Sequence, residues 1–159
     1  MNLRSNAIRL LDRMLTPSGT VHAHCDGPCG VYDPASARIA AEAVQSLTKK
    51  MVDMADPGND PAALRAHNNT FGRFVSIKEE QAELAKRELA ILWTDYFKPP
   101  HLEQFPDLHD TFWKALKLCS QCKQEVNPEA CGQLMDAIEN IHNIFWKSKG
   151  REVAWVRAS

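Results

Sequence analysis

The chain has 159 residues, a length typical of one domain with a sizeable core. Its 19 Lys and Arg nearly balance 20 Asp and Glu, so it lacks the strong positive charge of many nucleic-acid-binding proteins. No apolar run is long enough to cross a membrane, and no continuous apolar segment of a secretory signal occurs near the N-terminus. We therefore expect a cytoplasmic protein with mostly reduced thiols and with no nucleic-acid or membrane partner.

Residues 1–23 have apolar side chains at helical spacing, Ile8, Leu11 and Leu15 among them, until residues 16–20 (TPSGT) break the pattern. Residues 21–23 (VHA) look like the end of a secretory signal. However, charged side chains interrupt the apolar residues before them: Arg4, Arg9, Asp12 and Arg13. The pattern does not favour secretion.

Residues 24–32 read HCDGPCGVY and combine two cysteines and a histidine in one short segment. Three residues separate Cys25 from Cys29, whereas zinc knuckles and thioredoxin-like sites usually have two. The glycines and the proline of this segment allow the chain to reverse direction, so both sulfurs can point to one centre. A loop of this kind can supply several metal ligands, and we call residues 24–32 the hook.

The hook has a strong donor set if His24 is the first residue of a mature chain. The free amine, the amide nitrogen of Cys25 and the Cys25 sulfur would close two fused chelate rings, and the Cys29 thiolate would complete a square plane. Nitrogen and sulfur donors in a square plane suit Ni(II) or Cu(II) better than Zn(II), and the His24 imidazole could bind axially. The hook therefore predicts a redox metal.

The hook together with the next two residues (HCDGPCGVYDP) resembles nickel-dependent superoxide dismutases, and so do residues 92–101 (LWTDYFKPPH). The resemblance covers roughly residues 24–149. It implies a nickel cofactor that cycles between Ni(II) and Ni(III), conversion of superoxide to oxygen and hydrogen peroxide, and a homohexamer. It also implies that a dedicated leader peptidase removes residues 1–23, since without that cut the His24 nitrogen is an amide and not an amine.

The same resemblance assigns roles to other residues of the motifs. Tyr32 and Tyr96 would stand beside the open face of the metal, where they would order water and admit only a small anion. Lys98 would attract superoxide. Asp26 and Pro28 would shape the hook.

The chain departs from the family pattern near the axial imidazole. Where the family has a glutamate and an arginine, this chain has Ala40 and Gln81. Gln81 could still hydrogen-bond the ring of His24, and the orientation of that ring depends on this shell of side chains. Arg73 matches a family arginine and could instead be a structural ion-pair partner.

Long segments rich in Ala, Leu, Lys, Glu and Gln predict an all-α protein. We expect one helix opened by Asp33 and Pro34, a second over residues 61–93 that Gly72 could interrupt, a third after Asp107, and a fourth from residue 128 that stops at Gly150. Residues 95–106 should not form regular helix because of their prolines. The expected fold is an antiparallel four-helix bundle with an N-terminal metal-binding hook.

The organisation we expect is therefore a cleavable leader (1–23), the hook with the bundle (24–150) and a C-terminal tail (151–159). Cys119, Cys122 and Cys131 are interpreted as buried free thiols, because two of them lie on an apolar stripe and no histidine completes a metal site. Two alternative functions remain at this point. One is a nickel or copper carrier without turnover, and the other is a thiol switch in which Cys25 and Cys29 form a disulfide.

Overall fold

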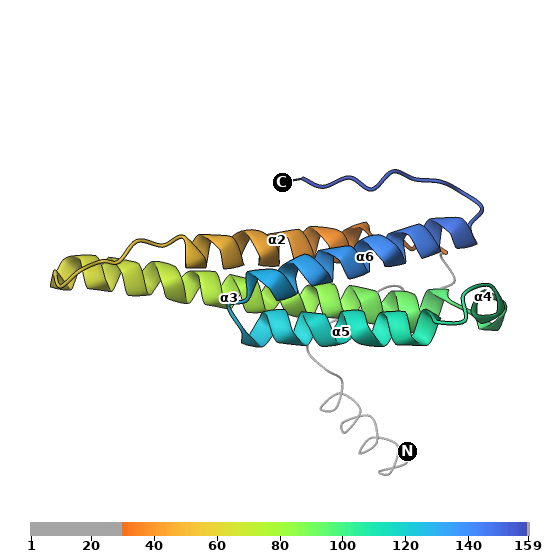
Figure 1. The fold of residues 1–159 in the computed structure, drawn as a ribbon, viewed down its shortest axis with the longest axis horizontal. Coiled ribbons are helices and arrows are strands. Elements are labelled where there is room, and N and C mark those ends of the chain that lie inside the picture. The colour runs from red at the N-terminus through yellow and green to blue at the C-terminus, as the bar shows by residue number, and fades with distance from the viewer. Residues whose placement is uncertain (1–29, 159) are drawn as a thin grey trace, which may run out of the picture.

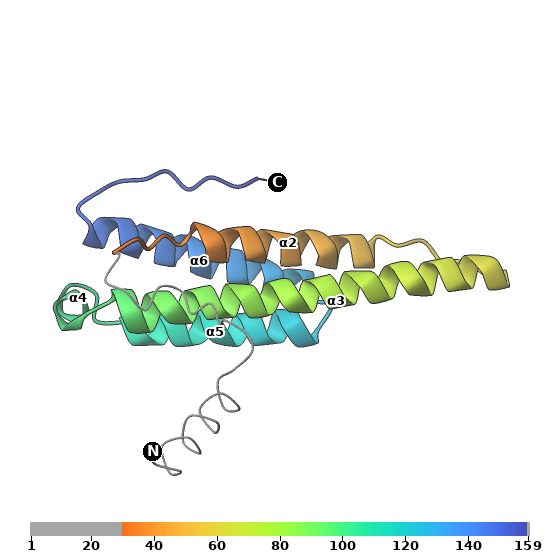
Figure 2. The same cartoon turned by 180° about the vertical axis from the view of Figure 1, so that it is seen from behind.

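The computed structural model describes residues 30–158, in which all regular structure is helical. The elements are α2 (Ala35–Val52), α3 (Pro61–Ile91), the π-helical turn η1 (Leu92–Tyr96), α4 (Pro99–Gln104), α5 (Leu108–Gln124) and α6 (Pro128–Ser148). Helices α2 and α5 each pack against both α3 and α6, and neighbouring helices run in opposite directions (Figures 1 and 2). The predicted antiparallel four-helix bundle is confirmed, with α4 as a short crossing between α3 and α5. No helix in this part of the chain is both long and apolar enough to span a bilayer.

Side chains at helical spacing from the four long helices fill the centre of the bundle. Fully buried members of this core are Val44, Leu89, Phe112, Ile138, Ile141 and Phe145. Burial of one such side chain stabilises a fold by about 1.5–3 kcal/mol, so these positions dominate the packing energy. Ile39 does not join this core, because it is 56% exposed on the outer face of α2.

The helix starts follow the local sequence. The side-chain oxygens of Asp60 and Asn127 accept hydrogen bonds from the third following backbone N–H, at 2.8 and 3.0 Å, and each precedes a proline at the first helical position. At α2, the Asp33 carboxylate accepts from the Ala35 N–H at 2.8 Å, so this helix begins one residue later than expected. Asp107 occupies the position before α5, but its side chain makes no capping bond.

Two local expectations are wrong. Helix α3 continues through Gly72, because one exposed glycine costs a long helix only about 1 kcal/mol. Residues 95–106 contain the six-residue helix α4, in which Pro99 and Pro100 take the first two positions. Proline is tolerated there because the first N–H groups of a helix have no intrahelical acceptor.

The N-terminal part of α3 extends beyond the ends of the other helices (Figures 1 and 2). Apolar side chains in the first half of α3 are only partly covered: Leu64 and Ile77 are exposed, and Phe71 and Phe74 are half-buried. Because the bundle covers these apolar side chains only in part, they form an exposed apolar surface on α3.

The C-terminal tail reverses direction at Gly150, where φ is 65°, and runs back along the bundle (Figure 1). The Val153 carbonyl lies 2.8 Å from His142 Nε2, and the Trp155 ring packs against the same imidazole with centroids 5.3 Å apart. Further along, the Glu42 carboxylate accepts a hydrogen bond from the Ala158 N–H at 2.9 Å. The tail is thus fixed to both α6 and α2.

Candidate metal centre

One end of the bundle gathers the start of α2, the end of α3 with η1, helix α4 and the end of α6 (Figure 1). Tyr32, just before α2, and Tyr96, the last residue of η1, meet there with ring centroids 5.6 Å apart. The structure therefore brings together the two tyrosines that the sequence motifs singled out. Residue 30, where the described chain begins, leads directly into this pair.

Packing and one hydrogen bond hold Tyr96 in place. Its ring lies 4.6 Å from the Phe145 ring and stacks on the His101 imidazole at 5.5 Å. The Tyr96 hydroxyl lies 2.7 Å from Ser148 Oγ, and the Ser148 hydroxyl donates to the Phe145 carbonyl at 2.6 Å. Since the Phe145 carbonyl can only accept, the Ser148 proton is committed to it, and the Tyr96 hydroxyl donates to Ser148.

The turn η1 sets the direction in which Tyr96 points. The N–H of Phe97 donates to the Leu92 carbonyl at 3.2 Å, a hydrogen bond that spans five residues and marks a π-type turn. The wider turn ends α3 and carries the chain toward Pro99. Nothing in the spacing of apolar residues in this segment indicates such a turn.

Two lysines lie near this end, only one of which the sequence motifs indicated. Lys98 is exposed and borders a cavity of about 420 Å³ formed with Trp93, Phe97 and His109. Lys149 places its ammonium 5.2 Å from the centre of the Tyr96 ring and 4.9 Å from that of Phe145. Lys149 was missed because its approach to Tyr96 depends on how α6 ends, which no local pattern encodes.

The residues expected to bind metal lie outside the described part of the chain. His24, Cys25, Asp26, Pro28 and Cys29 all precede residue 30, as does the expected leader over residues 1–23. Among residues 30–158, no group of three or more His, Cys, Asp and Glu side chains is arranged to hold a metal ion. The described residues thus contain no candidate ligand set of their own, and the ligands expected from the sequence lie outside them.

The residues expected near the axial imidazole lie on α2 and α3. Ala40 is fully buried in the core, whereas Gln81 is half-buried on α3. Arg73 is exposed beside Phe74 and Ile77, and none of the ion pairs within the described chain includes it. The ion-pair role considered for Arg73 finds no support in this part of the chain.

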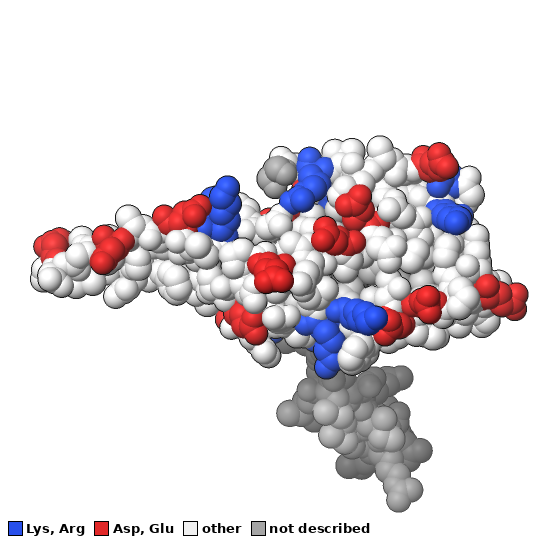
Figure 3. Space-filling model, viewed as in Figure 1, with Lys and Arg blue, Asp and Glu red and all other residues white. Residues whose placement is uncertain are grey.

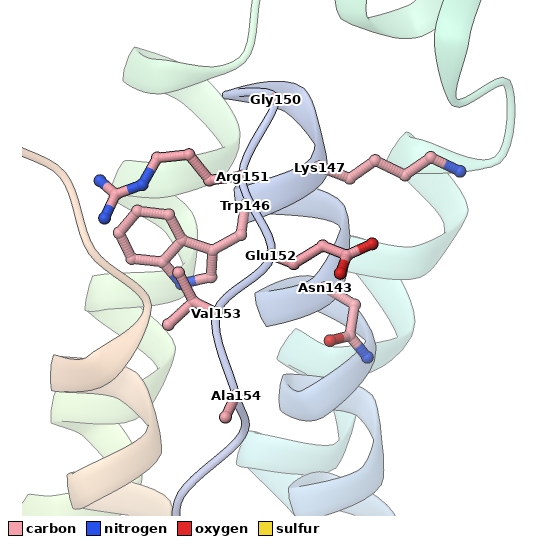
Figure 4. Close-up of a pocket in the computed structure, with 8 residues that line it drawn as sticks. All are labelled: Asn143, Trp146, Lys147, Gly150, Arg151, Glu152, Val153 and Ala154. Carbon is pink, nitrogen blue, oxygen red and sulfur yellow. The ribbon is translucent and has the colours of Figure 1, made fainter.

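A larger cavity, of about 760 Å³, lies between α6 and the C-terminal tail (Figure 4). The Arg151 guanidinium packs over the Trp146 ring, 4.8 Å from its centroid, and Lys147 points away toward the other side of the helix. Acidic and basic side chains are interspersed over the face seen in Figure 3, with no field of one sign. This cavity contains neither tyrosine of the candidate centre.

Comparison with known proteins agrees with these features. The family model described as nickel-containing superoxide dismutase matches residues 19–149. The chain belongs to this family. A nickel superoxide dismutase from Streptomyces coelicolor is 45% identical over 140 residues, which cover 88% of this chain and 98% of that protein. The corresponding protein from Streptomyces seoulensis is 44% identical over the same length.

Solved structures of the family share the fold. A native nickel superoxide dismutase superposes with a TM-score of 0.68 at 44% identity, covering 79% of this chain and 99% of that one. A structure whose nickel ligation corresponds to the oxidized state gives a TM-score of 0.70 at 43% identity, with 80% and 99% covered. The family match includes the hook, so His24, Cys25 and Cys29 fall within the matched residues.

Proposed function

We propose that His24, Cys25 and Cys29 bind nickel in a mature chain that begins at His24, and that superoxide is dismutated at this site. Family membership establishes the activity and the metal: the protein is a nickel-containing superoxide dismutase. The ligand set is our proposal. The observation that carries it is that the matched segment contains the complete hook, whose last residue, Tyr32, packs against Tyr96.

The donor chemistry of the hook fits nickel. An amine, a deprotonated amide and two thiolates form the nitrogen and sulfur set that a square-planar divalent metal prefers. When bound, nickel supplies one-electron redox chemistry, through which two superoxide anions and two protons become oxygen and hydrogen peroxide. The Cys25 and Cys29 thiolates would donate electron density to the bound metal and so would bring its redox potential toward the range that the reaction requires.

The described residues support this chemistry from the end of the bundle. The ring of Tyr32, the last residue of the hook, packs against that of Tyr96, and the Tyr96 hydroxyl is oriented by Ser148. We assign to the two tyrosines the ordering of water and the exclusion of larger ligands. Lys98 and Lys149 place positive charge near the same end, which would raise the arrival rate of an anion at low ionic strength. Asp26 and Pro28 would hold the shape of the hook.

Processing and location belong to the same proposal. A leader peptidase would remove residues 1–23 and expose the His24 amine, so nickel loading would follow cleavage. The protein would act in the cytoplasm, where thiols remain reduced until they bind the metal.

We also propose that the protein assembles with itself, as a homohexamer. The first half of α3 presents exposed Leu64 and Ile77 together with half-buried Phe71 and Phe74. In the same half of the helix, His67 Nδ1 is buried without a hydrogen-bond partner among the described residues. A second copy packed on this surface would cover the apolar side chains and could supply that partner. Light scattering of the purified protein measures the assembled mass; a monomer would contradict this part.

The deciding experiment compares two forms of the protein. One is trimmed to begin at His24, the other keeps residues 1–23, and both are treated with nickel in the same way before superoxide consumption is measured. Activity of the trimmed form alone supports the proposed ligands. Turnover by the intact chain, with its leader verified by mass spectrometry, would contradict the amine ligand.

Variants separate the alternatives. Cys25→Ser and Cys29→Ser should each abolish nickel retention and activity, whereas Cys119→Ser, a buried thiol on α5, should abolish neither. Trimmed protein that keeps stoichiometric nickel without consuming superoxide would favour a carrier. Isolation of a Cys25–Cys29 disulfide with no retained metal would favour the thiol switch.

A further inference from the structure

Three cysteines are buried at the end of the bundle opposite the tyrosine pair, where α5 ends and α6 begins (Figure 1). Cys119 and Cys122 lie in the last turns of α5 and Cys131 in the first turn of α6, and none is more than 1% exposed. The thiols of Cys122 and Cys131 are hydrogen-bonded to each other. Cys119, one turn earlier, is not part of this thiol–thiol bond. Two of the three cysteines thus form a pair across the junction of two helices.

Side chains from the other two helices complete the surroundings of the pair. From α2, Thr48 Oγ1 accepts a hydrogen bond from the Cys131 thiol at 3.4 Å. From α3, the buried ammonium of Lys78 donates to the carbonyls of Cys122, Lys123 and Glu125 at 2.6, 2.8 and 3.0 Å. All three ammonium protons are used, so Lys78 is a fixed positive charge at the end of α5.

This environment makes the two thiols unequal. A hydrogen bond with Cys122 lowers the pKa of Cys131, as do the Thr48 hydroxyl, which can turn to donate once the thiol has lost its proton, and the charge of Lys78, while burial opposes them. The bond to Cys131 and burial raise the pKa of Cys122. Burial also raises the pKa of Cys119, to about 12. Cys131 is therefore the first of the three to become a thiolate, which is the reactive form of cysteine.

We propose that Cys122 and Cys131 are a redox modification site at which hydrogen peroxide forms a reversible disulfide. The Cys131 thiolate attacks one peroxide oxygen, the O–O bond breaks, and sulfenic acid and hydroxide form. Cys122 then attacks the Cys131 sulfur, the S–O bond breaks and water leaves. Overall, two thiols and one hydrogen peroxide give one disulfide and two waters.

The oxidant is the product of the protein's own dismutase activity. The geometry explains why the pair would reach a disulfide and not higher oxidation states. Cys122 already contacts Cys131, so a sulfenic acid formed there meets a resolving thiol before a second peroxide arrives. The disulfide would bind the last turn of α5 covalently to the first turn of α6.

The test uses the full chain and added hydrogen peroxide, so it needs neither nickel nor activity. After oxidation, free thiols are blocked and the protein is digested with trypsin, which cuts after Lys117, Lys123 and Lys147. Cys119 and Cys122 then share the peptide over residues 118–123, and Cys131 lies in that over residues 124–147. We expect these two peptides as a cross-linked species that dithiothreitol separates.

Substitutions of single cysteines identify which sulfur atoms form the cross-link. Cys122→Ser and Cys131→Ser should each abolish the cross-link, and the matched control Cys119→Ser should retain it. A chain in which both hook cysteines are serine should also retain it, which separates this site from the metal centre. Thr48→Val, which keeps the volume and removes one hydrogen bond, should slow cross-linking several-fold.

Three results would overturn the proposal. The first is a cross-link that depends on Cys119. The second is sulfinic or sulfonic acid at Cys131 with no cross-linked species. The third is full recovery of both peptides as blocked free thiols while Cys25 and Cys29 are oxidised. Circular dichroism of each variant verifies that it keeps the native helix content, and Thr48→Val provides a test that leaves both cysteines in place.

Discussion

The ring of Tyr32 lies against the ring of Tyr96 with centroids 5.6 Å apart, although one residue precedes α2 and the other ends the turn after α3. This contact fixes the chain that leaves the hook onto the end of the bundle. The hydroxyl of Tyr96 is in turn oriented by Ser148 at the end of α6, 2.7 Å away. Three segments that are distant in sequence therefore determine one candidate site.

Tyr96→Phe tests the hydroxyl at this site. The ring packing is kept, so we expect a loss of only about 1 kcal/mol in unfolding free energy from the missing hydrogen bond. We expect superoxide consumption to fall by about tenfold. This loss is smaller than that expected when a lone proton donor is removed, because Tyr32 remains beside residue 96. Ser148→Ala is the control, since it removes the same hydrogen bond and leaves the hydroxyl. Equal loss of activity in both variants would show that the effect comes from the lost hydrogen bond, through orientation or folding, and not from the Tyr96 hydroxyl itself.

Lys78→Met tests the buried ammonium. Three carbonyls at the end of α5 lose their donor, and we expect urea unfolding to show a loss of about 3 kcal/mol. Lys123→Met is the comparison, because the exposed Lys123–Glu83 ion pair at 3.0 Å should contribute less than about 1 kcal/mol. Similar losses in the two variants would mean that Lys78 does not stabilise the helix end.

Glu42→Gln tests how the tail is held. Glu42 is buried and contacts Arg38 at 2.9 Å, the Ala158 N–H at 2.9 Å and Arg157 at 3.7 Å. Loss of its charge should free the tail, so that trypsin cuts after Arg151 several-fold faster and Trp155 emission moves to the red. Glu129→Gln, an exposed acid in the first turn of α6, should change neither. An unchanged cleavage rate in Glu42→Gln would show that His142 and Trp155 suffice to hold the tail.

The pH dependence of thiol oxidation follows from the unequal cysteines. The rate at which peroxide consumes the Cys131 thiol should rise with pH as the thiolate forms, and should level off above its pKa. Because that pKa is lowered, the plateau should come at a lower pH than for an ordinary cysteine. Cys119, with its pKa raised to about 12, should stay intact at neutral pH.

The measurement is the loss of free thiol in the peptides over residues 118–123 and 124–147 across a pH series. Thr48→Val removes one hydrogen bond that lowers the pKa of Cys131, so its profile should move to higher pH. A profile for Cys131 that rises only above the range of a free cysteine would contradict the assignment of the first thiolate.

Local signals were sufficient for much of the fold. The prolines at residues 61 and 128 follow residues whose side chains cap the helix, and both helices begin there. Gly150 adopts the positive φ that ends α6 as expected. Helix α4 was missed because the rule that proline breaks helices does not hold at the first positions, which the local sequence does not distinguish from a loop.

The sequence by itself predicts the chemistry of the hook, since donor types and spacing within one short segment restrict which metals can bind. It also determined the class of fold, because helical periodicity reports which face of each helix is buried. Only the tertiary structure decided that Lys149 and Ser148 meet Tyr96, and that Lys78 and Thr48 meet the Cys122–Cys131 pair. These contacts join different helices, and their formation depends on how the helices pack and where each one ends, which the spacing of residues within a single helix does not encode.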